Sequence, residues 1–239
     1  MRAPCRPILV LLLAVVPSIA LAQESPGIRP IAGSKGWFGI TLMLSAPQGD
    51  FNRYVGNGFG VNFNVAPKIE PSGALLLRFD LGFLQYGNER KTVCLSTTIG
   101  CRITVDVNTS NDILVGGVGP ELVLPRGTVR PYATATAGFA YFFTHSSVEG
   151  TDNITPFADT KNFDDFVFAW TGGGGLKIIL RESKRPIALD LGVRYHHNGE
   201  ASYLREGSII DNPDGSITIR PIRSQTNFVS YHVGASFGF

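Results

Sequence analysis

The stretch that decides the fold is the last one, VSYHVGASFGF, residues 229–239. Every second position carries an apolar or aromatic side chain: Val229, Tyr231, Val233, Ala235, Phe237 and Phe239. The positions between them carry small or polar side chains. A period of two puts alternate side chains on opposite faces of an extended chain, so the pattern predicts a β-strand with one apolar and one polar face. Chain ends are usually polar and frayed, whereas this strand is expected to run to the terminal residue.

The same alternation recurs along the chain, and no segment after residue 22 has a sustained helical period. In ALLLRFDLGFLQY, residues 74–86, Leu77 and Phe79 lie on one face while Arg78 and Asp80 lie on the other. Eight strands are predicted in this way, near residues 36–46, 57–67, 74–86, 110–124, 129–144, 166–181, 186–197 and 226–239. The sequence therefore predicts an all-β fold.

The connections between these strands alternate in length. Short segments rich in turn formers follow the second, fourth and sixth strands: KIEPSG, PRGT and ESKR. Longer segments follow the others, near residues 47–56, 87–109, 145–165 and 198–225. A soluble sandwich gives no reason for this sorting, but a membrane barrel has short periplasmic turns and long outer loops. We therefore predict an eight-stranded antiparallel, up-and-down transmembrane β-barrel over residues 35–239, with both termini at the short-turn end.

In a membrane barrel the outer face is apolar and the inner face is polar. Seven side chains fall opposite the large apolar ones and are predicted to face the lumen: Arg78, Asp80, Arg130, Lys177, Asp190, Arg194 and His232. A symmetric ESKR turn would place Lys177 across from Asp190 as an interior ion pair. Aromatic strand ends fit interfacial girdles: Trp37, Phe38, residues 141–143, residues 166–170, Phe237 and Phe239. The competing interpretation is a soluble lipocalin-like barrel, with apolar side chains inside and charges outside.

Residues 1–22 form a separate segment. Arg2 and Arg6 precede an apolar run at residues 8–16, and Ala20-Leu21-Ala22 has the form of a cleavage site. The run is shorter than the roughly 20 residues that a membrane helix needs. We expect a secretory signal peptide that is cleaved before residue 23, followed by a periplasmic segment, residues 23–34.

Composition limits the partners and the chemistry. Loss of Arg2 and Arg6 from the 21 basic residues leaves 19, which balance the 19 acidic residues. A chain without a basic field is not expected to bind nucleic acid. The two cysteines that remain, Cys94 and Cys101, are expected to close a small loop as a disulfide in an oxidising compartment. No histidine lies near them in sequence, so a metal site is disfavoured and no cofactor is expected.

The final stretch also carries a resemblance. HVGASFGF resembles the C-terminal assembly signal of bacterial outer-membrane barrels, through His232, Gly234, Phe237 and Phe239. With the signal peptide, the strand number and the loop order, the chain resembles the small eight-stranded Gram-negative family that includes OmpW and OmpX. The resemblance implies an outer-membrane location, contact with lipid and lipopolysaccharide, and recognition by the barrel assembly machinery. The oligomeric state stays open.

An eight-stranded barrel is barely wide enough for its own side chains, so a wide pore is not expected. Glycines recur at wall positions: Gly116, Gly117, Gly119, Gly138 and residues 172–175. They either let tilted strands coil and make room for Tyr132 and Arg194, or leave a narrow cavity. We expect a non-enzymatic protein, either a narrow porin-like channel for small solutes or a structural and surface-interaction barrel. CRITVDV and SITIRPI are predicted to extend the fourth and eighth strands beyond the membrane, where strand edges can bind partners.

The alternative function is an enzyme that modifies lipid A acyl chains. YHHNGE, residues 195–200, superficially resembles the lipid A deacylase site, but neither His196 nor His197 has the serine two positions on. THSS, residues 144–147, does carry His-x-Ser, with Glu149 close by. DNPDGS, residues 211–216, lacks the ligands of a calcium loop and is predicted to be a hairpin turn.

Overall fold

The computed structural model describes residues 34–94, 101–150, 153–214 and 216–239. The predicted signal peptide, residues 1–22, and the segment 23–34 apart from Ser34 lie outside the described residues. Within the described ranges, no helix has the length and apolar character needed to cross a membrane.

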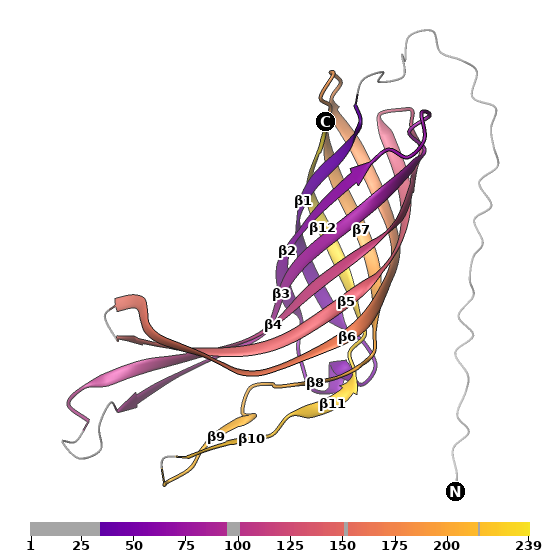
Figure 1. Cartoon of the computed structure of the whole chain (residues 1–239). Coiled ribbons are helices and arrows are strands. Elements are labelled where there is room, and N and C mark those ends of the chain that lie inside the picture. Colours follow the sequence, from indigo (N-terminus) through magenta and orange to yellow (C-terminus); the bar gives the residue numbers. More distant parts are fainter. Residues whose placement is uncertain (1–33, 95–100, 151–152, 215) are drawn as a thin grey trace, which may run out of the picture.

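Eight antiparallel strands close into a barrel (Figure 1), which confirms the predicted fold class. In order around the ring they are β1 (Gly36–Pro47), β12 (Phe228–Gly238), β7 (Ile187–Asn198), β6 (Asn153–Arg181), β5 (Val129–Gly150), β4 (Thr104–Val123), β3 (Leu75–Cys94) and β2 (Gly58–Pro67). Because β2 pairs with β1 in turn, every barrel strand has a partner on both sides. Such closure pairs the backbone N–H and C=O groups internally, which strands need in order to cross hydrocarbon.

The outer wall of the barrel is apolar and the inner wall is polar. Leu42 is 63% exposed and Val233 is 48% exposed on the outer wall, whereas Arg78 and Lys177 are fully buried inside. A lipocalin-like barrel requires the opposite arrangement, so that alternative is wrong. An apolar exterior on a closed barrel is the form in which strands span a membrane.

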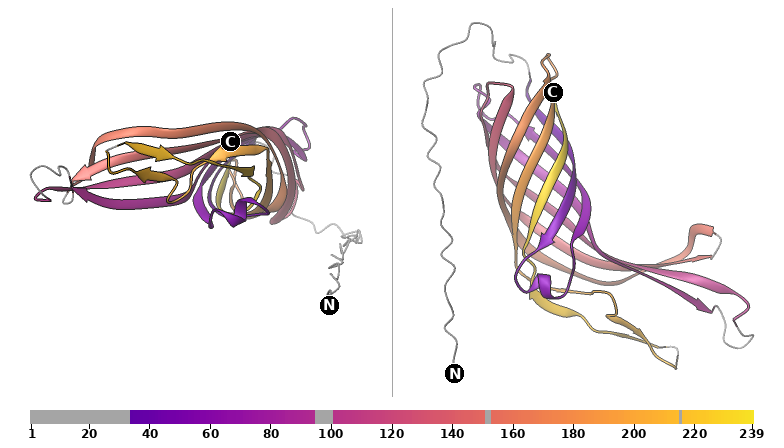
Figure 2. Two further views of the ribbon diagram at one scale, coloured as in Figure 1. Left: turned by 90° about the horizontal axis from the view of Figure 1, so that it is seen from below. Right: turned by 180° about the vertical axis from the view of Figure 1, so that it is seen from behind.

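Four strands are far longer than a membrane crossing needs. β3, β4, β5 and β6 have 20, 20, 22 and 29 residues, whereas a spanning strand takes about 9–11. Their extra length continues past the barrel rim as a sheet that bends away from the barrel axis (Figures 1 and 2). The predicted extension of the fourth strand is therefore confirmed. The segments 87–109 and 145–165, expected to be loops, are largely strand where the structure describes them.

The extension predicted for the eighth strand is wrong. SITIRPI instead forms β10 (Ile217–Ile219) and the start of β11 (Ile222–Gln225). These pair with β9 (Ile209–Asp211) and β8 (Glu200–Tyr203), so the last long connection folds as a broken hairpin. Pro221, between β10 and β11, has no N–H to donate to a continuous ladder. β9 and β10 pair antiparallel, so the connection between them is a hairpin as predicted for DNPDGS, of which Gly215 lies outside the described residues.

The connections are sorted by length as predicted. The short turns after β2, β4 and β6 lie at the same end of the barrel as the C-terminal residue (Figure 1). The long connections and a 3₁₀ helix, η1 (Phe51–Arg53), lie at the other end, which we call the extracellular end.

Candidate functional site

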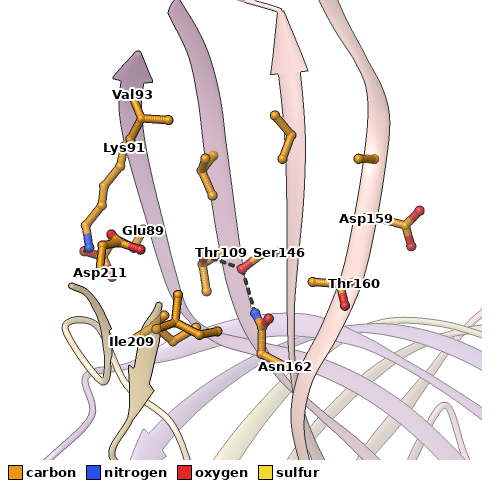
Figure 3. Close-up of a pocket in the computed structure, with 14 residues that line it drawn as sticks. Glu89, Lys91, Val93, Thr109, Ser146, Asp159, Thr160, Asn162, Ile209 and Asp211 are labelled. Atoms are coloured by element: carbon orange, nitrogen blue, oxygen red, sulfur yellow. Dashed lines mark hydrogen bonds and ion pairs between the residues drawn. The ribbon is translucent and has the colours of Figure 1, made fainter. Parts of the chain in front are cut away.

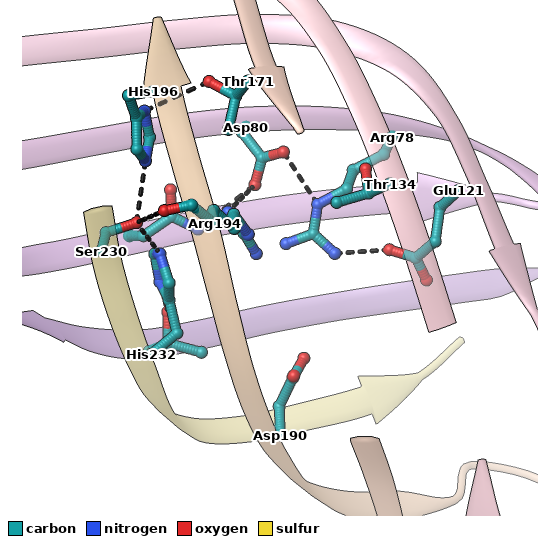
Figure 4. A network of polar contacts seen from close by, with 12 residues as sticks. Arg78, Asp80, Glu121, Thr134, Thr171, Asp190, Arg194, His196, Ser230 and His232 are labelled. Atoms are coloured by element: carbon teal, nitrogen blue, oxygen red, sulfur yellow. Dashed lines mark hydrogen bonds and ion pairs between the residues drawn. The ribbon is translucent and has the colours of Figure 1, made fainter. Parts of the chain in front are cut away.

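The centre of the lumen holds six charged side chains, three of each sign, which we call the polar network; five are buried and Asp80 is 11% exposed. Figure 4 labels all of them except Lys177. They come from β3, β4, β6 and β7: Arg78, Asp80, Glu121, Lys177, Asp190 and Arg194. Asp80 accepts from Arg78 Nε at 2.8 Å and from Arg194 Nη1 at 3.0 Å. Because burying an unpaired charge is strongly unfavourable, these pairs let the sequence place charges inside a narrow barrel.

The ion pair predicted for Lys177 has a different partner. Lys177 and Asp190 are cross-strand neighbours, as the symmetric turn predicted. The Lys177 ammonium, however, pairs with Glu121, which also binds Arg78. Glu121 reaches across the lumen from β4, and a register argument confined to β6 and β7 could not include it. The strand alternation could have identified Glu121 as a lumen residue. Leu122 beside it is 58% exposed on the outer wall, so Glu121 has to point inward.

Asp190 is held by neutral donors instead. The Tyr132 hydroxyl donates to Asp190 Oδ1 at 2.8 Å, and the Ser236 hydroxyl donates to Oδ2 at 2.7 Å. Tyr132 fits because two wall residues lack a side chain: a Cβ on Gly175 or on Gly192 would lie 2.7 Å from the Tyr132 hydroxyl oxygen. The glycines therefore make room for a lumen side chain, as one of the two sequence interpretations had it.

A chain of hydroxyl and imidazole groups lies beside the network. His196 contacts Thr171 through Nδ1 and Ser230 through Nε2, at 3.1 and 2.8 Å. The Ser230 hydroxyl also lies 2.7 Å from His232 Nε2. His196 and Ser230 come from β7 and β12 and are buried in the lumen, so this serine–histidine contact is walled off from lipid. Of the two histidines in YHHNGE, His196 therefore faces the lumen, whereas His197 lies on the other face and packs against Trp170, with ring centroids 5.2 Å apart.

The second enzyme candidate, THSS, is split between two faces. His145 Nδ1 lies 3.3 Å from the buried carboxylate of Asp112. The Ser146 hydroxyl turns the other way and bonds Thr109 and Asn162, each at 2.7 Å. Within the described chain no serine hydroxyl is hydrogen-bonded to His145, so the described hydrogen bonds assemble no Ser-His-carboxylate triad here.

An aromatic cluster closes the extracellular mouth of the lumen. This aromatic plug consists of Phe51, Tyr86, Phe142 and Tyr203, all buried. Phe51, from η1, lies 5.2 Å from the Tyr203 ring and 6.2 Å from the Phe142 ring, both edge to face. The Tyr86 hydroxyl donates to the Leu204 carbonyl at 2.9 Å, which ties β3 to the last long connection. Edge-to-face aromatic packing of this kind adds to the stability that burial provides.

A second apolar group, around Trp37, Leu76 and Val123, lies at the periplasmic mouth, where Trp37 and Val123 also line a hollow of about 750 Å³. Trp37, expected in an outer girdle, is only 3% exposed and points into the lumen, and Phe142 likewise belongs to the plug. Trp37 and Phe142 both occupy inward-facing positions of their strands. The alternation of side chains along a strand therefore decides where they point, and the preference of aromatic residues for the membrane interface does not. Phe38 and Phe166 do lie on the outer wall. Arg130 lies at this mouth and donates to the Gly127 carbonyl at 3.0 Å.

The remaining predicted residues lie apart from the lumen network. Cys94 and Cys101 form a disulfide at the tip of the β3–β4 connection, outside the barrel. Phe237 and Phe239 face outward on and beside β12. Gly234 is required by closure, since a Cβ there would lie 2.1 Å from the Ile40 carbonyl oxygen of β1. Recognition of these residues by an assembly machinery stays a prediction.

A pocket of about 330 Å³ lies outside the barrel, between the protruding sheet and the β9–β10 hairpin (Figure 3). Its walls are apolar: Val93, Val107, Val148, Ala158, Ile209 and Ile217. Its floor is a hydrogen-bonded set, Thr109, Ser146 and Asn162. Its rim carries Glu89, Asp159, Asp211 and Lys91, three acids against one base.

Glu89 fastens the hairpin to the sheet at this pocket. Its carboxylate accepts from the Gly207 N–H at 3.1 Å and pairs with Lys91 at 3.0 Å. Partial burial raises the pKa of Glu89, but the Gly207 and Lys91 contacts outweigh it, so the pKa lies below its ordinary value. In the part of the chain that the structure describes, no group of three or more His, Cys, Asp or Glu could hold a metal ion.

No family model matches the sequence, and none of the curated proteins matches it. Among solved structures, Ail, the attachment invasion locus protein of Yersinia pestis, is similar with a TM-score of 0.46 and 10% identity, over 87% of this chain and 99% of that one. A major outer membrane protein from Thermus thermophilus gives a TM-score of 0.44 and 12% identity, over 84% and 99%. The outer membrane protein OprG from Pseudomonas aeruginosa gives 0.41 and 11%, over 88% and 99%.

Proposed function

We propose that this protein is a non-enzymatic outer-membrane barrel that binds a protein partner at the cell surface, through the pocket between its protruding sheet and the β9–β10 hairpin. The single observation that carries the proposal is a division of the molecule. Charged and aromatic side chains occupy the lumen, whereas the protruding sheet and the β9–β10 hairpin, which exceed what a membrane crossing needs, form a pocket between them. An apolar exterior on a closed barrel supports the membrane location.

The filled lumen argues for the surface-interaction role over the narrow channel. Arg78, Glu121 and Lys177 are completely buried. The aromatic plug lies on one side of them and the apolar group around Trp37 lies on the other. A solute would have to break buried ion pairs to pass, which is strongly unfavourable.

The pocket chemistry predicts the kind of partner. Apolar walls with a few polar groups on the floor are typical of recognition sites. Three carboxylates and one ammonium on the rim favour a ligand that carries positive charge beside its apolar group. We therefore expect a peptide segment with an aliphatic or aromatic side chain next to Lys or Arg.

The test uses purified protein in lipid nanodiscs to select from a phage library of random ten-residue peptides. Selected peptides should share an apolar residue beside a basic one. Val148→Trp, which fills the pocket, should abolish their binding, as should replacement of residues 206–221 by a short Gly-Ser turn. Ser147→Trp, on the opposite face of the same strand, is the matched control and should still bind. Peptides that bind all variants equally, or a selection without a consensus, would contradict the proposal.

A further inference from the structure

The protruding sheet has two edges, and they differ in how much of each is paired. β2 pairs with β3 only as far as Gln85, and β7 pairs with β6 only from Ala169 onward. On β3, the charged run from Glu89 to Lys91 is engaged: Glu89 bonds Gly207, and Arg90 pairs with Asp106 at 2.8 Å. On β6, the edge that faces away from β5 has no strand partner between residues 156 and 164 in the described part of the chain. An unpaired strand edge is a template for another strand.

We infer that the β6 edge pairs antiparallel with the same edge of a second copy of this chain, about a two-fold axis at Thr160. This inference is argued from the sheet edge and stands whether or not the pocket binds a peptide, although Asp159 and Thr160 also line the pocket.

The sequence around Thr160 is self-complementary in charge. In an antiparallel pair centred on Thr160, residue 159 of one copy faces residue 161 of the other. Asp159 and Lys161 lie on the same face of β6, and both are exposed. Figure 3 shows the Asp159 carboxylate pointing away from the neighbouring strand and toward the open edge. The two-fold axis therefore creates two symmetric Asp159–Lys161 pairs, with a neutral residue on the axis itself.

Lys161 has a partner within its own chain that the new pair would replace or share. Its ammonium lies 3.1 Å from Asp164 and donates to the Tyr141 hydroxyl at 3.3 Å, and the Lys161 and Asp164 side chains are well exposed. Exposed pairs of this kind contribute little to stability, so exchanging Asp164 for Asp159 of the second copy costs little.

The β3 edge does not offer an equivalent arrangement. A pair centred on Arg90 would set Glu89 against Lys91 of the other copy, but it would also place the two Arg90 guanidinium groups directly opposite each other. Like charges in that position are destabilising. Glu89 also holds Gly207 of the last long connection, and Arg90 pairs with the buried Asp106, so moving either side chain breaks contacts that join parts of the fold.

The geometry of the sheet suits two barrels in one membrane. Seen from the extracellular end, the protruding strands lie side by side (Figure 2). The two-fold axis of an antiparallel edge pair is perpendicular to the sheet, so it points along the barrel's end-to-end direction, as two copies in one bilayer require. Nine residues separate Thr160 from Ala169, where the barrel wall begins, or about 30 Å at ~3.3 Å per residue. The barrels then stand about 60 Å apart and do not collide.

The test is disulfide trapping in native outer membranes. Directly opposed residues have Cα atoms ~4.5–5.5 Å apart, within the range for a disulfide. Thr160→Cys should therefore give a disulfide-linked dimer on a non-reducing gel. Ala158→Cys, two residues away on the same face, is the matched control, because its copies lie too far apart to link. The native Cys94–Cys101 pair stays within one chain.

Charge reversal in the Thr160→Cys background tests the register. Asp159→Lys or Lys161→Asp should lower the dimer yield about tenfold, because each sets like charges opposite one another. The double variant Asp159→Lys with Lys161→Asp should restore it. Heat-modifiability of each variant shows that its barrel is folded. A folded Thr160→Cys protein that stays monomeric, equal linking by Ala158→Cys, links only to other proteins, or failure of the double variant to restore the dimer would each overturn the inference.

Discussion

The same four strands, β3 to β6, lie in two settings, and the contrast explains how the molecule is organised. Inside the barrel every strand edge is paired, and the inner face carries the polar network and the aromatic plug. Beyond the rim the ring opens, the outer edges of β3 and β6 lose their strand partners, and the inner face becomes valine-rich under the β9–β10 hairpin.

This difference follows from the solvent on each side. In hydrocarbon an unpaired backbone group is strongly unfavourable, so closure is compulsory and the lumen must be filled by whatever the inner positions supply. In water an open edge and an apolar pocket are tolerated, and both can recognise partners. The barrel therefore anchors the chain, and the sheet is free to carry specificity.

The largest effect should come from breaking the polar network. Glu121→Ala leaves Arg78 and Lys177 buried without their shared carboxylate, so we expect a loss of roughly 3–5 kcal/mol in the free energy of unfolding. Urea titration of the protein in lipid vesicles, followed by the gel shift of the folded barrel, measures it. Glu121→Gln, which keeps the size and some hydrogen bonds, should lose less.

The matched control lies on the sheet. Glu149→Ala, on the protruding part of β5, should change the free energy of unfolding by less than about 0.5 kcal/mol. Equal losses for Glu121→Ala and Glu149→Ala would remove the distinction between the two settings of these strands.

A smaller effect is expected where the hairpin meets the sheet. Because the pKa of Glu89 is lowered in the folded protein, its contacts stabilise the hairpin above the ordinary carboxyl pKa, and the stabilisation is lost as pH falls through the lowered value. Hydrogen exchange at the Gly207 amide should stay constant from neutral pH to about 5, after correction for the intrinsic exchange rate, and lose protection below about 4. Glu89→Gln should reduce the protection at neutral pH by about twofold to fivefold, since the pair is partly exposed. Protection that is unchanged in this variant would show that Glu89 does not fasten the hairpin.

The barrel could be predicted from the sequence because membrane crossing imposes a strict period of two. If Leu77 and Phe79 face the lipid, Arg78 and Asp80 have to face the lumen. The same argument predicts that Lys177, Asp190 and Arg194 face the lumen. The cross-strand neighbours Lys177 and Asp190 followed from one symmetric turn.

Contacts across the lumen and within the long connections could not be predicted in this way. Pairing of Lys177 with Glu121 depends on how side chains from opposite walls meet, which no single register fixes. Phe51 and Tyr203 come from segments without strand periodicity, so nothing in their spacing predicted the plug. The pocket depends on where the β9–β10 hairpin docks, which is set by Glu89 and Gly207, residues far apart in the chain.

The most direct test of a filled lumen is single-channel recording of the wild-type protein in planar bilayers, with its folded state verified on the same sample by heat-modifiability. Because buried ion pairs and an aromatic plug block the lumen, we expect no discrete steps in the ionic current across the bilayer at moderate voltage and salt. Stable ohmic steps from the folded monomer would contradict this account and return the function to a channel.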